Sequence, residues 1–513
     1  DANTTANNNT AIGHVSLTIN TTGANNTAIG NGALSANSTA SNNTAIGYDA
    51  LDKNTTGSQN VALGSLALDA NTTASNNTAV GFNSLGLNTT GGNNVAVGAN
   101  ALDACTTGSS NTALGAASLG ANTTASNNTA IGKGCMVTNT TGGNNTAVGM
   151  QSLESNTTGA QNTAIGVNAL IANTTASNNT AVGMGSLDSN TTGYDNNAVG
   201  VGALGQNTTA FRGNAFGVSA LASNTTGIQN NAFGYAALNL NTTATGNSAF
   251  GHAALAACTT GNNNTAVGNI GLLSNTTGVD NTVVGSLAGD AITTGIQNVA
   301  VGKDALTAVT TGNNNVSIGK GSLSVASGGS SGNSAVGEAS GYTVTSGTRN
   351  TFIGKATGGP TDANRTVIIG ADLGDRGNTS NMVVIGTGAV VASFTGSASG
   401  WTFSSDGRDK TDIVDLPLGL DFVNKLRPRK FRWDYRDKTR FPIESAENPN
   451  MLIRSGFIAQ EVQELLQQEN AEYTKLVGDE KPDQLTVGMT DMIPMLVNAI
   501  KELSAKVTAL EAG

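Results

Sequence analysis

One short pattern of polar and apolar residues recurs through residues 1–390. The unit reads Asn-Asn-Thr-Ala-Ile/Val-Gly-x-x-Ala/Ser-Leu-x-x-Asn-Thr-Thr-Gly/Ala-x, and the Gly after Ile/Val returns at every 17th position from Gly13 to Gly319. Four looser units end at Gly337, Gly354, Gly370 and Gly386. All 23 units have Ile, Val, Leu or Phe directly before this Gly. The region is therefore a tandem repeat.

A 17-residue unit is too short for a pair of helices, and its Gly, Asn and Thr favour turns and strands. Each unit predicts one coil of a β-solenoid, with a short strand at Thr27, Ala28 and Ile29. Successive strand residues face opposite sides. We expect Ile29 and Leu34 in the core, and Ala28 on a face where a neighbouring chain comes close.

Equivalent residues of successive coils should stack along the solenoid. Asn26 and Thr27 then lie above their counterparts, so that an Asn ladder forms, while Gly23 and Gly30 take turn conformations that need no Cβ. One coil buries too little apolar surface to offset its ordering entropy. The predicted fold is a mostly β, trimeric β-solenoid of 17-residue coils over residues 1–400.

The C-terminal residues 489–513 have a different apolar period. Spacings of four and three alternate, which predicts the seam of a trimerising coiled-coil helix. The alternative is one helix packed on its own domain. Pro494 places the helix start close to it. The seam residues are Met489, Ile493, Leu496, Ile500, Leu503, Val507 and Leu510.

Charge divides the chain near residue 400. Residues 1–403 hold 15 acidic and 9 basic side chains, whereas residues 404–513 hold 19 and 15. The net charge of −10 argues against nucleic acid and polyanionic membrane as partners. No apolar run reaches the roughly 18 residues of a transmembrane helix, so no membrane insertion is expected.

The repeated Asn-Thr-Ala-Ile-Gly segments resemble the left-handed β-roll heads of trimeric autotransporter adhesins and the shafts of some phage tail fibres. The resemblance covers residues 1–390. The 17-residue period is longer than the commonest head repeat. The resemblance implies an elongated rod rather than an enzyme cleft.

Three segments follow in order in the last part of the chain. They are Phe403-Ser-Ser-Asp-Gly-Arg-Asp-Lys-Thr-Asp-Ile-Val-Asp-Leu416, Leu426-Arg-Pro-Arg-Lys-Phe-Arg-Trp433 and Gly456-Phe-Ile-Ala-Gln-Glu-Val-Gln-Glu-Leu-Leu466. They resemble the endosialidase-type intramolecular chaperone that ends many phage tailspikes and tail fibres. The resemblance implies a small α+β domain at residues 401–488 that trimerises, registers the upstream β-structure and commonly cuts itself off.

The same resemblance gives Ser405 as nucleophile and Lys410 as its base, with cleavage at the Ser405–Asp406 bond. The lysine needs a lowered pKa to accept a proton. Ser405 cannot attack its own carbonyl without a four-membered ring, so attack comes from a neighbouring subunit or an activated water. Some family members use a histidine, and none follows His252 here. The alternative is a solvated charged turn, and any enzymatic activity is at most one turnover.

Asp52 and Asp69 occupy equivalent places in adjacent coils, as a glycosidase pair or a cation site requires. Their repeat position varies, however, which indicates an exposed row without a site. Other residues at this position are Ser35, Gly86, Ile171 and Ala222.

The three cysteines do not form a disulfide or metal pattern. Cys105 and Cys258 share one repeat position nine coils apart, on the order of 40 Å. Cys135 has no partner, and free thiols fit assembly in a reducing cytoplasm. No metal or cofactor is expected. The Asn-x-Thr triplets match the glycosylation pattern, but their repeat phase favours a ladder or turn role.

A basic run interleaved with aromatics favours a strand of the chaperone domain over a nucleic-acid site. Its residues are Arg427, Arg429, Lys430, Phe431, Arg432 and Trp433.

These features together predict a homotrimeric phage or prophage tail-fibre shaft with a C-terminal registering chaperone. It would be assembled in the host cytoplasm, join an upstream virion attachment protein and engage a host receptor or glycan. The alternatives are a bacterial surface adhesin with the same chaperone, located at the cell surface, and a glycan-degrading tailspike. Because the sequence begins at Asp1 in mid-repeat, we expect the native protein to continue upstream or to be processed.

Overall fold

A computed structural model of the chain contains two compact units, Asp1–Ser404 and Ser405–Gly513. The first unit holds the repeats and the second holds the charged C-terminal part. The residues that the structure describes are 5–359, 361–362, 364–374, 380–388, 390–395, 402–403, 413–431, 454–471, 474, 476–478, 485–488 and 490–512.

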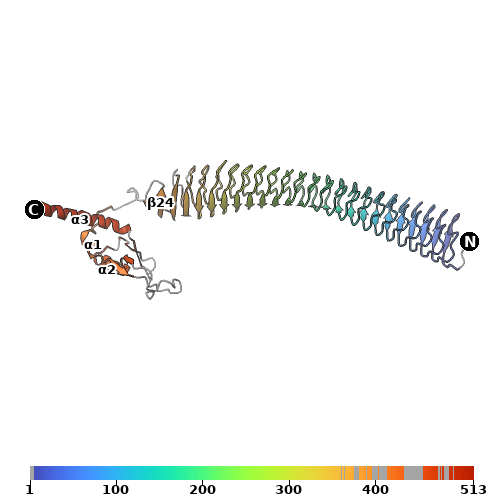
Figure 1. The fold of residues 1–513 in the computed structure, drawn as a ribbon, viewed down its shortest axis with the longest axis horizontal. Coiled ribbons are helices and arrows are strands. Elements are labelled where there is room, and N and C mark those ends of the chain that lie inside the picture. The colour runs from blue at the N-terminus through green and yellow to red at the C-terminus, as the bar shows by residue number, and fades with distance from the viewer. Residues whose placement is uncertain are drawn as a thin grey trace. The chain divides into compact units, whose positions relative to one another are not determined.

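The repeat unit is a β-solenoid in which each coil contributes one short strand. Successive strands pair in parallel without a register shift, so that Ala28 pairs with Ala11 and with Ala45. Figure 1 shows these strands side by side along the solenoid. The predicted 17-residue coil and the strand Thr27–Ile29 are confirmed. The three-residue strands are β1 (Thr10–Ile12), β2 (Thr27–Ile29), β3 (Thr44–Ile46), β4 (Val61–Leu63), β5 (Thr78–Val80), β6 (Val95–Val97), β7 (Thr112–Leu114), β8 (Thr129–Ile131), β9 (Thr146–Val148), β10 (Thr163–Ile165), β11 (Thr180–Val182), β12 (Asn197–Val199), β13 (Asn214–Phe216), β14 (Asn231–Phe233), β15 (Ser248–Phe250), β16 (Thr265–Val267), β17 (Thr282–Val284), β18 (Val299–Val301), β19 (Val316–Ile318), β20 (Ser334–Val336) and β21 (Thr351–Ile353).

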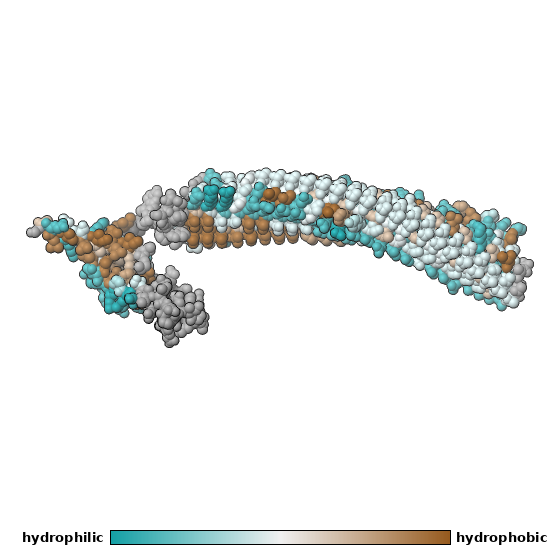
Figure 2. Space-filling view, viewed as in Figure 1, coloured by the Kyte–Doolittle hydropathy of each residue, from teal (hydrophilic) through white to brown (hydrophobic). Residues whose placement is uncertain are grey.

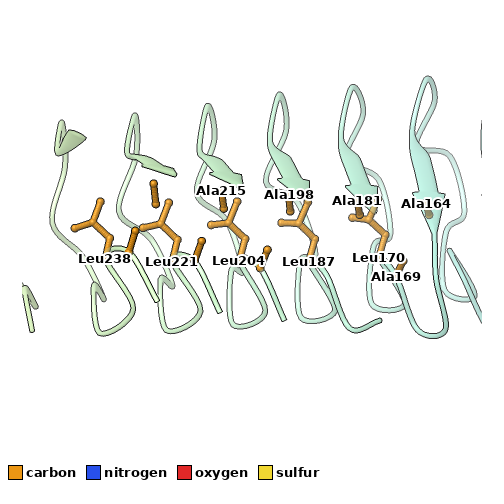
Figure 3. Packing of buried hydrophobic residues seen from close by; sticks show 14 of the residues in the cluster. Ala164, Ala169, Leu170, Ala181, Leu187, Ala198, Leu204, Ala215, Leu221 and Leu238 are labelled. Carbon is orange, nitrogen blue, oxygen red and sulfur yellow. The ribbon is translucent and has the colours of Figure 1, made fainter. Parts of the chain in front are cut away.

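The interior of each coil holds alanine, leucine and asparagine. Ala28 and Leu34 are completely buried, whereas Ile29 is only partly buried on the other face of its strand. Figure 3 shows the same alanine and leucine columns farther along, at Ala198 and Leu204. Leu34 is confirmed as a core residue, but the core assignment of Ile29 and the outward assignment of Ala28 are wrong. Leu34 and the asparagines fill the coil, which leaves room for only a small side chain on the strand.

The buried leucines have an unusual backbone. Leu34 has a φ of +50°, and its equivalents Leu51 and Leu68 have φ values of +54° and +53°. Such a conformation is costly for a bulky residue unless its surroundings fix it. The Leu34 N–H donates to the carbonyl of Ala50 in the next coil at 3.1 Å. A coil is therefore held in this shape by its neighbour.

Two ladders of buried asparagines run through the solenoid. In the first, Asn26 Oδ1 accepts from the backbone N–H of Asn43 at 3.0 Å. In the second, Asn37 Nδ2 donates to Asn20 Oδ1 at 3.0 Å and to the carbonyl of Ala40 at 3.0 Å. The predicted Asn26 ladder is confirmed, and so is the ladder role of the Asn-x-Thr triplets. These bonds satisfy polar groups that burial would otherwise leave unpaired.

A column of glycines follows the strands. Gly30 has a φ of +134°, and a Cβ there would lie 2.3 Å from the carbonyl oxygen of Gly47 in the next coil. The turn prediction is confirmed for Gly30. Gly23 does not have a positive φ, but it also lacks room for a Cβ, which would overlap the carbonyl oxygen of Ala40 in the next coil. Ala40 takes the equivalent place in the next coil.

The packing of the solenoid changes at its C-terminal end, and the strand pairing then reverses. The inward-facing middle residue of the strand, alanine in most coils, becomes Phe352, Ile368 and Val384 in successive coils, and all three are buried. The pairing then changes from parallel to antiparallel, which ends the stack. The strands of this end are β22 (Val367–Ala371), β23 (Met382–Thr387), β24 (Val390–Thr395) and β25 (Thr402–Phe403).

The C-terminal unit is a small α+β domain with a core of its own. Phe422, Val462, Leu466 and Met495 are buried together in this core. Two antiparallel strand pairs, β26 with β27 and β28 with β29, accompany the helices. Its elements are α1 (Leu420–Lys425), β26 (Arg429–Phe431), β27 (Arg454–Gly456), α2 (Ala459–Gln468), β28 (Val477–Gly478), β29 (Thr486–Val487), η3 (Thr490–Met492) and α3 (Ile493–Glu511).

Candidate functional site

The outer face of the shaft carries a continuous row of apolar side chains, the residue directly before the glycine column in every coil. We call this row the apolar ridge. Its side chains are partly or well exposed; Ile165, for example, is 40% exposed. Over the C-terminal half of the shaft, Figure 2 shows a hydrophobic band on the side where Figure 1 draws the strands. The ridge consists of Ile12, Ile29, Ile46, Leu63, Val80, Val97, Leu114, Ile131, Val148, Ile165, Val182, Val199, Phe216, Phe233, Phe250, Val267, Val284, Val301, Ile318, Val336, Ile353, Ile369 and Ile385.

Sequence reasoning missed the ridge because it assigned these side chains to the core. The available signal was the coil itself: a 17-residue coil that already encloses one leucine and two asparagines leaves little further space. The large apolar residue that ends each strand then had to face outward. In the structure, the alanine of the strand faces the core and the large apolar residue faces outward, which is the reverse of the prediction.

Helix α3 has a second exposed apolar surface. It begins at Ile493 with Pro494 in its first turn, as predicted. Six of the predicted seam residues are exposed, and the exposed fractions reach 65% at Ile500 and 82% at Leu510. The seventh, Met489, lies outside the described residues. The role of these residues as a trimer seam stays a prediction.

The opposite face of α3 packs on its own domain. Met495 and Ala499 are buried, and Asn498 Nδ2 donates to the carbonyl of Leu416 at 3.0 Å. Glu502 Oε2 accepts from the N–H of Leu420 at 3.0 Å. The packed helix and the exposed seam are therefore compatible, since they use different faces.

The basic run is tied into the domain by an ion pair. The guanidinium of Arg429 donates from Nε to Glu461 Oε2 at 2.9 Å and from Nη2 to Oε1, joining β26 to α2. This contact holds the pKa of the Glu461 carboxyl below its usual range. The strand interpretation is confirmed for Arg429, Lys430 and Phe431. It is wrong for Arg427, which precedes the strand, and Arg432 and Trp433 lie outside the described residues.

The predicted cleavage residues cannot be placed. Ser405, Asp406 and Lys410 all lie outside the described residues, so the Ser/Lys pair stays a prediction. In the described part of the chain, no group of three His, Cys, Asp or Glu side chains is arranged to hold a metal ion.

The acidic pair of the shaft is split between separate partners. Asp69 pairs with Lys53 at 3.1 Å, and Asp52 accepts a hydrogen bond from Ser35. Both contacts lie on the surface row whose residue type varies from coil to coil.

The cysteines are free and buried. Burial raises the pKa of the Cys105, Cys135 and Cys258 thiols to about 11. Cys258 stands in the second asparagine ladder between Asn241 and Asn275, where a thiol cannot replace both amide hydrogen bonds. Asn241 Oδ1 and both side-chain polar atoms of Asn275 are left without a partner.

Replacing Cys258 by Asn is expected to stabilise the shaft by about 1–3 kcal/mol, because a restored amide pairs Asn241 Oδ1 and Asn275 Nδ2. Denaturant unfolding checks this against Cys135→Ala, a matched control outside the ladder. Cys135 takes a place that Ala33 and Ala50 fill in other coils. A Cys258→Asn shaft no more stable than the parent would contradict the ladder account.

The comparisons with known proteins address the C-terminal unit. Residues 405–470 match the family model for the chaperone of endosialidase. The matched segment contains α1, β26, β27 and α2, and it ends before α3. The chain thus combines a segment similar to the chaperone of endosialidase with a β-solenoid shaft. No curated protein and no solved structure is similar enough to count as a match. Among the described helices, none is both long and apolar enough to cross a membrane.

Proposed function

We propose that this chain forms a homotrimeric tail-fibre shaft that extends from a phage particle to the host surface and is registered by its C-terminal chaperone domain. The observation that carries the proposal is the apolar ridge, which continues through all strands from β1 to β23. The same proposal includes attachment through an upstream virion protein and engagement of a host receptor or glycan. A rod with this surface is suited to act as the spacer between the virion protein and the receptor.

The ridge is too large for the free surface of a monomer. With strands about 4.8 Å apart, the shaft is on the order of 100 Å long, and a ridge about 10 Å wide covers roughly 1,000 Å². Monomers rarely expose more than a few hundred Å² of contiguous apolar surface. The area exceeds the roughly 800 Å² that each partner buries in a standard interface.

A second copy of the chain fits this surface better than an unrelated partner. Any partner must present apolar groups at the spacing of the coils over the whole length of the shaft. A parallel copy has them at the same heights, because every strand pairs in register with the next. Around a threefold axis, the ridges of three copies would meet along one line and bury one another.

The C-terminal domain supplies what the shaft lacks. Successive coils are nearly identical, so a slip by one coil exchanges each contact for a similar one. A chaperone domain that assembles first, through the exposed seam of α3, fixes the alignment of the chains. The seam residues include Ile500 and Leu510, which their own domain leaves uncovered.

Light scattering on the full chain tests the proposal. We expect particles with three times the chain mass of 51.1 kDa. A stable monomer of the whole chain would overturn the trimer and, with it, the role of the ridge. Chemical cross-linking at increasing protein concentration serves as the control for non-specific association.

We expect slow or conditional self-cleavage at the Ser405–Asp406 bond. An unperturbed lysine, with a pKa of about 10.4, is a poor base near neutrality. Burial, or the neighbouring cation Arg408, would lower the pKa of Lys410. If assembly supplies the burial, cleavage waits until the trimer has formed.

Mass spectrometry of the purified trimer checks this prediction. The parent should gain a terminus at Asp406, Ser405→Ala and Lys410→Ala should not, and the neighbouring-hydroxyl control Ser404→Ala should behave as the parent. A chain that stays intact after prolonged incubation, or fragments that neither variant prevents, would leave only the chaperone role.

A further inference from the structure

Four consecutive coils differ from the rest of the outer face. In β13, β14 and β15 the ridge residue is phenylalanine, whereas the 20 other ridge positions hold Ile, Val or Leu. In β12, β13 and β14 the first strand residue is asparagine, a residue that no other described strand of the shaft has at this place. We call β12 to β15 the register segment.

The three phenylalanines form one ordered stack. The ring centroids of Phe216 and Phe233 lie 4.7 Å apart, and those of Phe233 and Phe250 lie 4.9 Å apart. The interplanar angles are 7° and 9°, and the side chains are 39%, 36% and 40% exposed. Because phenylalanine is longer than the aliphatic residues on either side, the ridge projects farther from the shaft over these three coils.

The asparagines form a second ordered row beside this stack. Asn197 Nδ2 donates to Asn214 Oδ1 at 2.9 Å, and Asn214 Nδ2 donates to Asn231 Oδ1 at 2.8 Å. These side chains are on the outer face, separate from the buried ladders. In most other coils the position holds threonine, which cannot form such an amide chain.

We infer that the register segment aligns the copies of the chain with one another along the shaft. The inference rests on the proposed trimer and adds which residues distinguish the correct alignment from a slipped one. The segment is continuous with the ridge on both sides, at Val199 and Val267. The surface that meets another copy elsewhere therefore meets it here as well.

Size and polarity both oppose a slip. When the copies are aligned, each phenylalanine layer contains only phenylalanines. If one copy slips by one coil, a phenylalanine enters a valine layer and a valine enters a phenylalanine layer, which overpacks the first and leaves a cavity in the second. The asparagine row is displaced at the same time, so that the level of Thr180 in one copy meets asparagine in the other, and the level of Ser248 does the same at the opposite end of the row. A buried asparagine specifies alignment in coiled coils by the same principle.

The test moves the segment by one coil in the full chain. The moved variant carries Thr180→Asn, Val199→Phe, Asn231→Thr and Phe250→Val, and it is coexpressed with the parent chain under a different affinity tag. All four residues lie on the outer face of the strands, where they do not fill the coil interior. Expressed alone, the moved variant should assemble as well as the parent, since its own copies match.

In coexpression, the number of mixed trimers should be at least about tenfold lower than for a control pair. When the C-terminal domains of the copies are aligned, two ridge layers contain both phenylalanine and valine and therefore mismatch. The control chain exchanges two aliphatic ridge residues, Ile165→Val and Val182→Ile, and should mix statistically with the parent. Tandem purification on both tags measures the mixed fraction. Statistical mixing of the moved variant with the parent would overturn the inference.

A cross-link separates failure of this inference from failure of the proposed function. Val148→Cys in all chains places a thiol on the ridge outside the register segment, while the native thiols are buried. A short bismaleimide should join the thiol introduced at position 148 of one copy to the thiol at the same position of another copy. If this product forms but the moved variant mixes freely, only the inference is wrong. If no product forms, the ridge does not join copies, and the proposed trimer is wrong as well.

Discussion

A chain expressed without residues 404–513 is expected to give at least about tenfold less soluble trimer than the full chain, because long arrays with unpaired edges aggregate when their assembly is unguided. The register segment distinguishes aligned from slipped copies only after they are in contact. It cannot bring the chains together at one end. Coils outside the segment are nearly interchangeable, so slipped contacts form readily and persist.

The matched control removes the same residues after assembly. A protease site inserted near residue 404 in the full chain allows the C-terminal domain to be cut off once the trimer has formed. The shaft should then remain trimeric, with an unchanged sedimentation profile apart from the lost mass. Equal yields of soluble trimer with and without the domain during expression would show that it is no chaperone for this shaft.

An aspartate on the apolar ridge is expected to disrupt the trimer. Ile165→Asp would place three carboxylates in one layer, where the loss of hydration costs several kcal/mol per ion. In an isolated chain the same change would have an effect of about 0.5 kcal/mol or less, because the side chain is on the surface. Light scattering and thermal unfolding of the variant distinguish the two cases.

Thr158→Asp is the control for this substitution, since it adds the same charge at an exposed turn residue of the same coil. It should leave the trimer and its unfolding temperature close to those of the parent. Similar behaviour of the two variants would mean that the ridge is free surface.

The repeat period alone predicts much of the shaft. The spacing of Gly13 and its equivalents predicts the coil length, and the segment Thr27–Ile29 predicts the strand. Leu34 is also assigned correctly to the core. These features follow from local chemistry: a glycine that allows positive φ, β-branched residues in a strand, and an apolar residue at a fixed phase.

The choice between the two faces of the strand could not be made in the same way. Alternation states that Ala28 and Ile29 face opposite sides, but not which side is inward. Hydrophobicity favours Ile29 inside, whereas the space left by Leu34 and the asparagines admits only Ala28. The positive φ of Leu34 could not be predicted from the sequence either, because it depends on contacts with the next coil rather than on leucine itself.

The candidate sites were less accessible to sequence reasoning than the shaft. The heptad spacing predicted helix α3 and the phase of Ile500 and Leu510, since a helix requires only local information. The pairing of Arg429 with Glu461 was not predicted, because it joins segments 32 residues apart. Ser405 and Lys410 came from family resemblance, and their relative position depends on the folded domain.

The glycine column has a consequence for how such proteins change over generations. Gly30 approaches Gly47 as Gly47 approaches Gly64, so each coil presents to the next the same surface that it receives from the previous one. A gene segment that encodes one coil can therefore be duplicated or lost between repeats without creating a new junction. Recombination of this kind would change the length of the shaft in steps of about 4.8 Å. If copies align as inferred, a change in the register segment would produce chains that no longer assemble with the parent chain.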